Sequence, residues 1–270
     1  MVAHSWGMQL FVASVYLFLY IPIIILVLFS FNAGTYSIDW MGFSGKWYYA
    51  VFNSPEAGTA LLNSLLVAFF SVFLSVTLGS LYVFYGPMAG LKRASSFFYL
   101  SLAVPEIVLA AGLLSMFVCM GIPCGLITLI VAHTILGLGY VIPIVGARLE
   151  ELDSRLLEAS YDLGATKFQT FRYIVLPFLS PSLIASALLV FILSLDDFIL
   201  SFFCAGPAMQ TLPVYLFALI RAGASPMVNV ISTLMLIVSA CIVAIFSWVE
   251  FKRRYVRWKF LTINISCVSA

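Results

Sequence analysis

Long apolar runs separated by short polar breaks are the dominant pattern along the chain. Five stretches contain no Asp, Glu, Lys or Arg, and each supplies the roughly 20 apolar residues that a transmembrane helix needs. Breaks that contain Gly, Pro and Ser set the limits of the helices along the chain. The pattern therefore predicts an all-α, polytopic membrane protein with six transmembrane helices. The predicted helices are residues 8–31, 60–85, 96–120, 126–147, 182–204 and 227–249.

The composition supports this class of protein. Hydrophobic residues make up 63% of the chain and charged residues 9%, with a mean hydropathy of +1.13. A soluble globular domain has about 45–50% apolar residues, so this chain lies well outside that class. The first apolar run has no Lys or Arg before it, and we therefore expect it to remain as a membrane anchor rather than to be cleaved as a signal peptide.

The distribution of Lys and Arg predicts the orientation. Six spans place both termini and the second and fourth breaks on one side of the membrane, together with eleven cations, against two on the other side. Cytoplasmic loops carry the excess of Lys and Arg, so both termini are expected in the cytoplasm. The eleven cations are Lys92, Arg93, Arg148, Arg155, Lys167, Arg172, Lys252, Arg253, Arg254, Arg257 and Lys259, and the two are Lys46 and Arg221.

One polar segment, residues 153–177, interrupts this apolar chain with the signals of a short capped helix. Asp153 or Ser154 can cap its start, because the side-chain oxygen of either residue accepts a bond from a free backbone N–H group. Gly164 follows at the place where a left-handed residue ends a helix, a conformation that glycine adopts without steric cost.

A second short helix is predicted directly after Gly164. Thr166 and Gln169 have the spacing of a capping box, and Pro177 is expected to end this helix. One interpretation of the two helices is a solvated linker between the fourth and fifth spans. The other is a rigid element that fits a groove on a cytoplasmic partner. One face of the first helix carries Leu156, Ser160 and Leu163, and another carries Glu158 and Asp162.

The segment resembles the EAA motif of ABC importer permeases, in which Glu-Ala-Ala is followed after three residues by Gly and after nine more by Ile-x-Leu-Pro. Every spacing matches, and the one departure is Ser160 for the second Ala, which we expect to leave the helix face nearly unaltered. In that family the motif is the coupling helix that inserts into a cleft of the ATPase subunit. The matching residues are Glu158, Ala159, Ser160, Gly164, Ile174, Leu176 and Pro177.

Other stretches resemble the spermidine/putrescine branch of the same family, namely residues 16–48, 104–114, 193–207 and 212–236. The resemblance implies a type I ABC importer permease fold. Residues 1–58 would form the first transmembrane helix and an extracytoplasmic loop, residues 59–250 the transmembrane domain, and residues 251–270 a cytoplasmic tail. It also implies a homologous second permease, an ATPase dimer that binds ATP and an extracytoplasmic polyamine-binding protein as partners. This chain is then expected to bind lipid but neither a cofactor nor nucleic acid.

Three carboxylates lie inside predicted spans: Glu106, Asp196 and Asp197. A charge near the bilayer centre costs about 2.5–3.5 kcal/mol, so such residues usually face a cavity, a pathway or a partner. They are therefore candidates for a pathway for polyamines, which carry several ammonium groups. Because neighbouring helical residues diverge by about 100°, Asp196 and Asp197 can share one cavity only if the helix is broken there. The alternative is that one acid caps such a discontinuity or satisfies a neighbouring helix. Available aromatic walls are Tyr140, Phe198 and Phe202.

Catalysis is not indicated by any motif. An aspartic dyad needs two carboxylates close together on different helices, and the chain has no P-loop pattern. The cysteines form no CxxC pair and no zinc or haem pattern, although Cys119 and Cys124 flank a predicted outer turn and could form a disulfide. The remaining alternatives are an importer for another small cation or ferric iron and, in a different class, an ATP-independent channel or secondary transporter.

Overall fold

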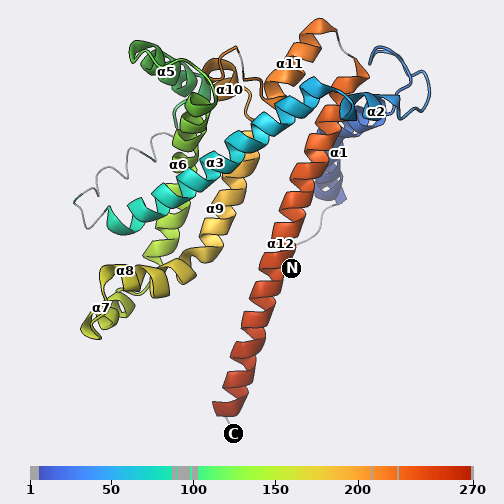
Figure 1. Ribbon diagram of the computed structural model, residues 1–270. Helices are drawn as coiled ribbons and strands as arrows, with labels where there is room; N and C mark the ends of the chain where they lie inside the picture. Colours follow the sequence, from blue (N-terminus) through green and yellow to red (C-terminus); the bar gives the residue numbers. More distant parts are fainter. Residues whose placement is uncertain are drawn as a thin grey trace. The chain divides into compact units, whose positions relative to one another are not determined.

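The fold is built from helices. A computed structural model shows helices and one isolated bridge, between Asn32 and Phe43, and contains no strand within the residues that it describes (Figure 1). This confirms the predicted all-α class. The described residues are 6–86, 90, 98, 103–207, 209–223 and 225–268, with side chains described as far as residue 248.

The chain folds as two compact units, and the first consists of residues 1–58 and 215–241. Its α1 (Trp6–Phe29) contains no charged residue and tolerates Pro22 in its interior, as expected of a helix in lipid. A short helix that was not predicted, α2 (Lys46–Phe52), follows in the loop after α1.

Asn32 organises this loop between α1 and α2. Its side-chain oxygen accepts hydrogen bonds from the backbone N–H groups of Gly34 (3.1 Å) and Met41 (2.9 Å), and its amide donates to the carbonyl of Asp39 (2.7 Å). The side chain is fully buried, so these bonds replace those that water would make.

The second unit consists of residues 59–214 and 242–270 and holds the candidate site. Within it α6 packs along α9, and α5 packs against α10. The helices of this unit are α3 (Pro55–Tyr85), α5 (Glu106–Cys119), α6 (Leu126–Glu150), α7 (Ser154–Asp162), α8 (Lys167–Thr170), the π-helical turn η2 (Phe171–Val175), α9 (Leu176–Asp196) and α10 (Ile199–Cys204). The first turn of α3, residues 55–58, belongs to the first unit, and two further helices, α11 (Leu212–Ala222) and α12 (Pro226–Val268), also contribute residues to both units.

Small residues let α3, α6 and α9 approach one another closely. A Cβ atom added to Gly137 of α6 would lie 2.8 Å from Ser75 Oγ on α3 and 2.9 Å from Val190 Cγ1 on α9. A Cβ atom on Gly79 of α3 would lie 2.6 Å from Val141 Cγ1 on α6. Such contacts are typical of membrane helices, whose association depends on close van der Waals packing rather than on the exclusion of water.

The third and sixth predicted helices differ from those observed. Within residues 103–120 the expected helix begins only at Glu106, because Pro105 disfavours a helical conformation in the residue before it. Phe98, the one described residue between 96 and 102, is helical. Most of residues 96–102 lie outside the described part. The sixth helix, expected to end at residue 249, continues as α12 to Val268, and the Lys and Arg residues just beyond the apolar span favour a helix.

The helix that was predicted to end near Pro177 instead continues through it. The helical run proceeds from α8 through η2 into α9, and Pro177 occupies the first turn of α9. An α-helix would place the proline ring against the carbonyl of Tyr173. The wider π-helical turn immediately before the proline, in which Leu176 N donates to Phe171 O, accommodates the ring.

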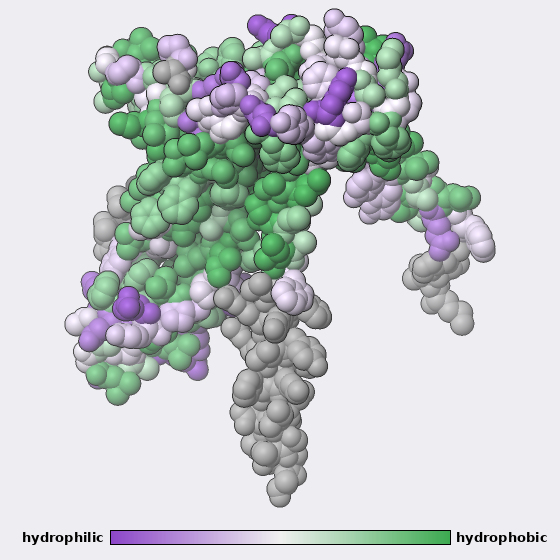
Figure 2. All heavy atoms as spheres, turned by 45° about the vertical axis from the view of Figure 1, so that its right-hand side comes forward, coloured by the Kyte–Doolittle hydropathy of each residue, from purple (hydrophilic) through white to green (hydrophobic). Residues whose placement is uncertain are grey.

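Among the described residues, five helices are long and apolar enough to cross a membrane: α1, α3, α6, the run from Lys167 to Asp196, and Pro226–Trp248 of α12. The apolar helices α5 and α11 are shorter, with 14 and 11 residues. Figure 2 shows apolar side chains over the long helices of the second unit and polar side chains at the end that holds α7 and α8. The chain is therefore an integral membrane protein with a polar helical element beside its spans.

Candidate functional site

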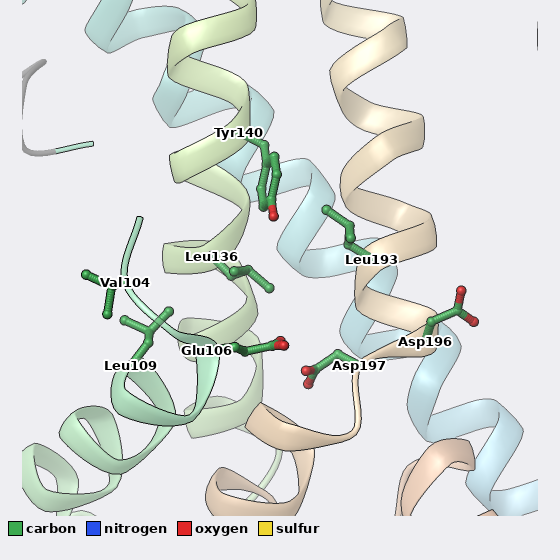
Figure 3. Close-up of a pocket in the computed structure, with 8 residues that line it drawn as sticks. All are labelled: Val104, Glu106, Leu109, Leu136, Tyr140, Leu193, Asp196 and Asp197. Carbon is green, nitrogen blue, oxygen red and sulfur yellow. The ribbon is translucent and has the colours of Figure 1, made fainter. Parts of the chain in front are cut away.

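A pocket of about 210 Å³ lies where α5, α6 and α9 meet, and all three acids predicted from the sequence line it. The acids come from different places: Glu106 is at the start of α5, Asp196 is the last residue of α9, and Asp197 follows it. The remaining walls are apolar apart from the tyrosine hydroxyl, and Tyr140 was predicted as a wall. These wall residues are Val104, Leu109, Leu136, Tyr140 and Leu193 (Figure 3).

The fifth predicted helix, expected as one piece over residues 182–204, is broken at Asp197. This residue is extended (φ −70°, ψ 118°) between α9 and α10, so the condition under which neighbouring acids can line one cavity is met. The Asp197 carboxylate accepts hydrogen bonds from Leu200 N (3.3 Å) and Ser201 N (3.0 Å), the free N–H groups at the start of α10. Asp197 thus caps a discontinuity, the alternative that the sequence analysis left open, and it also lines the pocket.

The two aspartates are not equivalent. Asp197 is buried, at 7% exposure, whereas Asp196 is exposed. The carboxyl groups of Glu106 and Asp197 point toward one another, while that of Asp196 points away from both (Figure 3). Two facing carboxylates in a low-dielectric setting repel each other, and a cation between them relieves this repulsion.

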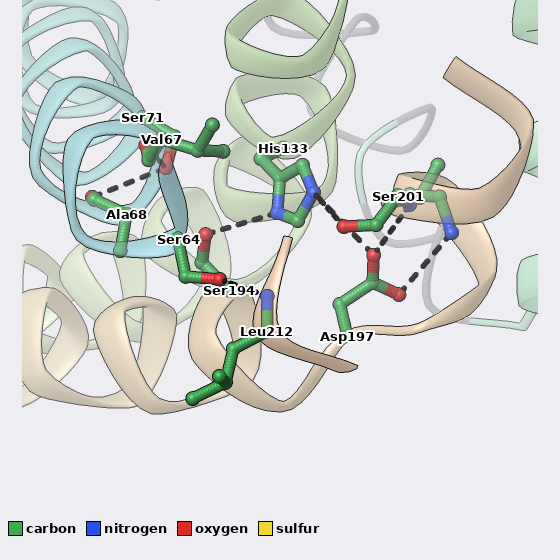
Figure 4. A network of polar contacts seen from close by, with 10 residues as sticks. Ser64, Val67, Ala68, Ser71, His133, Ser194, Asp197, Ser201 and Leu212 are labelled. Carbon is green, nitrogen blue, oxygen red and sulfur yellow. Dashed lines mark hydrogen bonds and ion pairs between the residues drawn. The ribbon is translucent and has the colours of Figure 1, made fainter. Parts of the chain in front are cut away.

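His133 connects Asp197 to the surrounding helices and was not predicted as a site residue. Its Nδ1 lies 2.9 Å from Ser194 Oγ, and its Nε2 lies 3.4 Å from both Ser201 Oγ and a carboxylate oxygen of Asp197 (Figure 4). The whole residue is 1% exposed. Its sequence signal was available, because it is the one ionisable imidazole in the uncharged stretch from residue 107 to 147.

The polar segment forms the two capped helices that the sequence predicts. Asp153 caps α7 by accepting a hydrogen bond from Arg155 N (3.0 Å). Gly164 ends it with φ +81°, and the N–H groups of Gly164 and Ala165 donate to Tyr161 O (2.9 Å) and Ser160 O (3.0 Å). These two bonds form a Schellman motif, which requires a left-handed residue at this position.

The start of α8 also agrees with the prediction. Thr166 N donates to Gln169 Oε1 (2.8 Å), and Gln169 N donates to Thr166 Oγ1 (3.3 Å), so the capping box is formed. The chain therefore turns between α7 and α8 without leaving these backbone donors free.

The residues of the EAA-like motif occupy different environments on this element. Glu158, Ala159, Gly164 and Pro177 are exposed, Ile174 and Leu176 are half-buried, and Ser160 is buried. The predicted face of Leu156, Ser160 and Leu163 does not act as one surface, because the two leucines are 53% and 89% exposed. The side chains of Phe168 and Tyr173 are also exposed, at 62% and 72%. Such apolar exposure on a polar element is typical of a surface that another protein covers.

Ser160 makes a contact that an alanine could not make. Its hydroxyl lies 2.9 Å from that of Thr170 on α8, and both side chains are buried. Cys119 and Cys124 are both free, so the turn between them carries no disulfide.

Comparison with known proteins identifies the family. Residues 92–255 match the family described as "Binding-protein-dependent transport system inner membrane component". The chain is 37% identical over 238 residues to the "Spermidine/putrescine transport system permease protein PotC" of Haemophilus influenzae, covering 87% of this chain and 93% of that protein. It is 34% identical over 229 residues to the "Putrescine transport system permease protein PotI" of Escherichia coli, covering 81% of this chain and 82% of the relative.

Solved structures agree on the fold. A bacterial ABC transporter that imports the acidic polysaccharide alginate matches with a TM-score of 0.70 at 16% identity, covering 92% of this chain and 94% of that one. The MetNI methionine ABC transporter matches with a TM-score of 0.58 at 20% identity, covering 73% and 97%. Sequence, fold and the capped polar element lead to the same conclusion. The chain belongs to the binding-protein-dependent inner membrane components, the permeases of ABC importers.

Proposed function

We propose that this permease carries spermidine or putrescine across the bacterial inner membrane in an ATP-driven importer. The observation that carries the proposal is the pair of facing carboxyl groups, Glu106 and Asp197, in a pocket with mostly apolar walls. Relatives with 34–37% identity over most of the chain are named as spermidine/putrescine or putrescine permeases, which supports the same substrate class.

The chemistry of the pocket suits a polyamine. Each ammonium group needs an acceptor or an opposite charge, which the carboxylates of Glu106 and Asp197 supply. The methylene chain between ammonium groups needs apolar contacts, which Leu136 and Leu193 supply. The volume of about 210 Å³ is below the 300–1,000 Å³ of common small-molecule sites, so a slender chain fits better than a bulky solute.

The proposed topology has six crossings with both termini in the cytoplasm. The five long apolar helices support five of these crossings, and α5 would belong to the third in chain order. Residues 1–58 would form the first helix and an extracytoplasmic loop, residues 59–250 the transmembrane domain, and residues 251–270 a cytoplasmic tail. The positive-inside distribution supports this orientation, although Lys92 and Arg93 lie outside the described residues.

The proposed assembly pairs this chain with a homologous permease, an ATPase dimer and an extracytoplasmic polyamine-binding protein. ATP is bound and hydrolysed by the ATPase subunits, and this chain performs no catalysis. The element of α7 and α8 docks into the ATPase subunit through its motif residues, among them Glu158, Ala159 and Gly164. Its exposed apolar side chains and its rigid, capped turn support this role, because a groove can transmit motion only to an element that holds its shape.

Uptake measurements test the proposal. The complete importer would be reconstituted in vesicles that contain ATP or no nucleotide, and uptake of labelled putrescine and spermidine would be compared with that of ferric ion. We expect polyamine uptake that requires both ATP and the binding protein. Uptake without ATP would support a channel or secondary transporter, and transport of ferric ion alone would exclude the polyamine assignment.

A further inference from the structure

We infer that His133 is a positioning residue for the cation pocket: it fixes the break between α9 and α10 and thereby directs the Asp197 carboxylate into the pocket. The inference rests on the proposed function, in which Asp197 meets the passing cation. It assigns a role to a residue that does not line the pocket itself.

The contacts of His133 lie on both sides of the break. Ser194 is in the last turn of α9, Ser201 is in α10, and Asp197 lies between the two helices. His133 reaches all three from the middle of α6, across 61 residues of sequence to Ser194 and 68 to Ser201 (Figure 4). A single side chain thus fastens the end of one helix, the start of the next and the residue that joins them.

The break needs such a fastening for two reasons. A helix interruption leaves backbone N–H and C=O groups without their helical hydrogen bonds, and it lets the two helices change direction relative to one another. Asp197 caps two N–H groups of α10, but these bonds move with α10 and do not fix its direction relative to α9. The hydrogen bond between the Ser194 hydroxyl and His133 Nδ1 ties the imidazole to α9, and the opposite edge of the ring contacts α10. The direction of the carboxylate therefore depends on the imidazole as well as on the cap.

The hydrogen-bond partners define the tautomer that this role requires. A carboxylate only accepts hydrogen bonds, so Nε2 carries the proton where it faces Asp197, and Nδ1 accepts from the Ser194 hydroxyl. Every polar contact of the ring is then satisfied by a neutral imidazole. A neutral ring leaves the negative charge of Asp197 available to the pocket, so loss of His133 changes where the charge points and not how much charge is present.

If His133 had a purely structural role, its replacement would have a different effect on the pocket. If His133 only filled space in the core, its replacement would lower the amount of folded protein and slow every reaction in the pocket alike. If it positions Asp197, its replacement changes the preference of the pocket for cations over neutral molecules. The ratio of two labelling rates at one site separates these cases, because misfolding affects both rates together.

The experiment uses the assembled importer with a cysteine in place of Leu193, a residue of the pocket wall. The rate of labelling of this cysteine is measured with a cationic and with a neutral thiosulfonate of similar size. Mass spectrometry of the peptide that contains the cysteine gives the rate, so that the native cysteines do not interfere. The ratio of cationic to neutral rates is compared between the parent and the variants Asp197→Asn, His133→Ala, the double variant and Ser194→Ala. Thr134→Val is the matched control, since Thr134 is a buried neighbour whose hydroxyl bonds only to Ile130 O (2.6 Å) among the described contacts.

We expect the ratio to fall roughly fivefold or more in both Asp197→Asn and His133→Ala, as one nearby charge at an effective dielectric constant near 20 has an effect of that order or larger. The double variant should match Asp197→Asn alone, because His133 acts through Asp197. Ser194→Ala, which frees the imidazole but leaves the cap intact, should lower the ratio about twofold, and Thr134→Val should leave it unchanged.

Each result decides between the two proposals. A native ratio in His133→Ala, or in Ser194→Ala should the first variant fail to assemble, would overturn the positioning role. If Asp197→Asn lowers the ratio in the same experiment, the cation pocket itself stands. A native ratio in Asp197→Asn would instead remove the acid from the pathway and with it the basis of the proposed function.

Discussion

The hydroxyl groups of Ser160 and Thr170 lie 2.9 Å apart and join the two short helices of the polar element. Ser160 donates its single proton to Leu157 O (2.7 Å), so the Thr170 hydroxyl is the donor between the two side chains. Both residues are buried, at 6% and 1% exposure. The family motif has Ala at the position of Ser160, so this bond is an addition to the motif that stiffens the turn at Gly164.

The first prediction concerns this bond. Ser160→Ala leaves the buried Thr170 hydroxyl without its acceptor and should destabilise the element by about 1–3 kcal/mol. The affinity of the ATPase subunit for the permease should fall roughly tenfold, since 1.4 kcal/mol corresponds to a factor of ten. Binding of the purified ATPase to the permease in detergent measures the change.

A second substitution provides the control for this prediction. Thr170→Val removes the donor, and the double variant Ser160→Ala/Thr170→Val leaves neither hydroxyl in place. Its loss of affinity for the ATPase should therefore be smaller than the sum of the losses in the two single variants. Ser154→Ala on the exposed start of α7 should behave like the parent protein. Additive losses in the double variant would show that the hydroxyl pair does not act as a unit.

The second prediction concerns Gly164, whose φ of +81° places it in the left-handed region. A Cβ atom there would meet nothing within 4 Å, so the cost of a larger residue comes from the backbone and not from a clash. Gly164→Val should cost about 1–2 kcal/mol and uncouple transport, because a left-handed conformation is unfavourable for a β-branched residue. ATPase co-purification and uptake should both fall while membrane insertion persists.

Gly164→Asn is the matched variant, because asparagine tolerates the left-handed region better than valine does. It should retain most uptake and subunit association. If valine and asparagine behave alike, or if valine supports normal uptake and association, the turn is not required for docking.

The third prediction distinguishes the two aspartates. Asp197→Asn removes a buried charge that faces Glu106, and an opposite charge at 4 Å is worth about 4 kcal/mol at an effective dielectric constant near 20 before desolvation. Losing a third of that lowers the maximal uptake rate roughly tenfold. Asp196→Asn should have a smaller effect, because its carboxyl group is exposed and points away from the pair.

Uptake with saturating loaded binding protein measures this difference, and Glu106→Gln should resemble Asp197→Asn. Glu150→Gln, which neutralises an exposed acid at the end of α6, serves as the control and should leave uptake unchanged. Affinity of the binding protein for polyamine should be the same throughout. Wild-type uptake rates in both Asp197→Asn and Glu106→Gln would show that these acids are structural.

The fourth prediction concerns orientation. A cysteine at position 46 should react with a membrane-impermeant reagent added to intact cells, whereas cysteines at positions 155 and 167 should react only after the cells are opened. Position 254 should behave like the latter two. Reaction at position 167 from outside would overturn the proposed topology and, with it, the docking of α7 and α8 to a cytoplasmic ATPase.

Features that depend on neighbouring residues were largely predictable. The capping box of Thr166 and Gln169 and the left-handed turn at Gly164 follow from residue type and short spacing, and the structure confirms both. The uncharged runs likewise predicted the long helices, because about 20 apolar residues are stable in lipid only with their backbone bonds satisfied within the helix. The effect of Pro177 was predicted wrongly, since a π-helical turn allows the helix to continue.

The residues alone identify a helical membrane protein, the position of its polar element and the three acids that are energetically unfavourable inside a membrane span. Each of these follows from transfer free energies and local hydrogen bonding, which act within a few residues. The packed structure was needed to show that the helix breaks at Asp197, that Glu106 rather than Asp196 faces that residue, and that His133 fastens the break. These features depend on contacts between side chains some sixty residues apart, which the packing of α5, α6, α9 and α10 brings together. An interrupted helix costs backbone hydrogen bonds, so it is stable only where such contacts compensate for them.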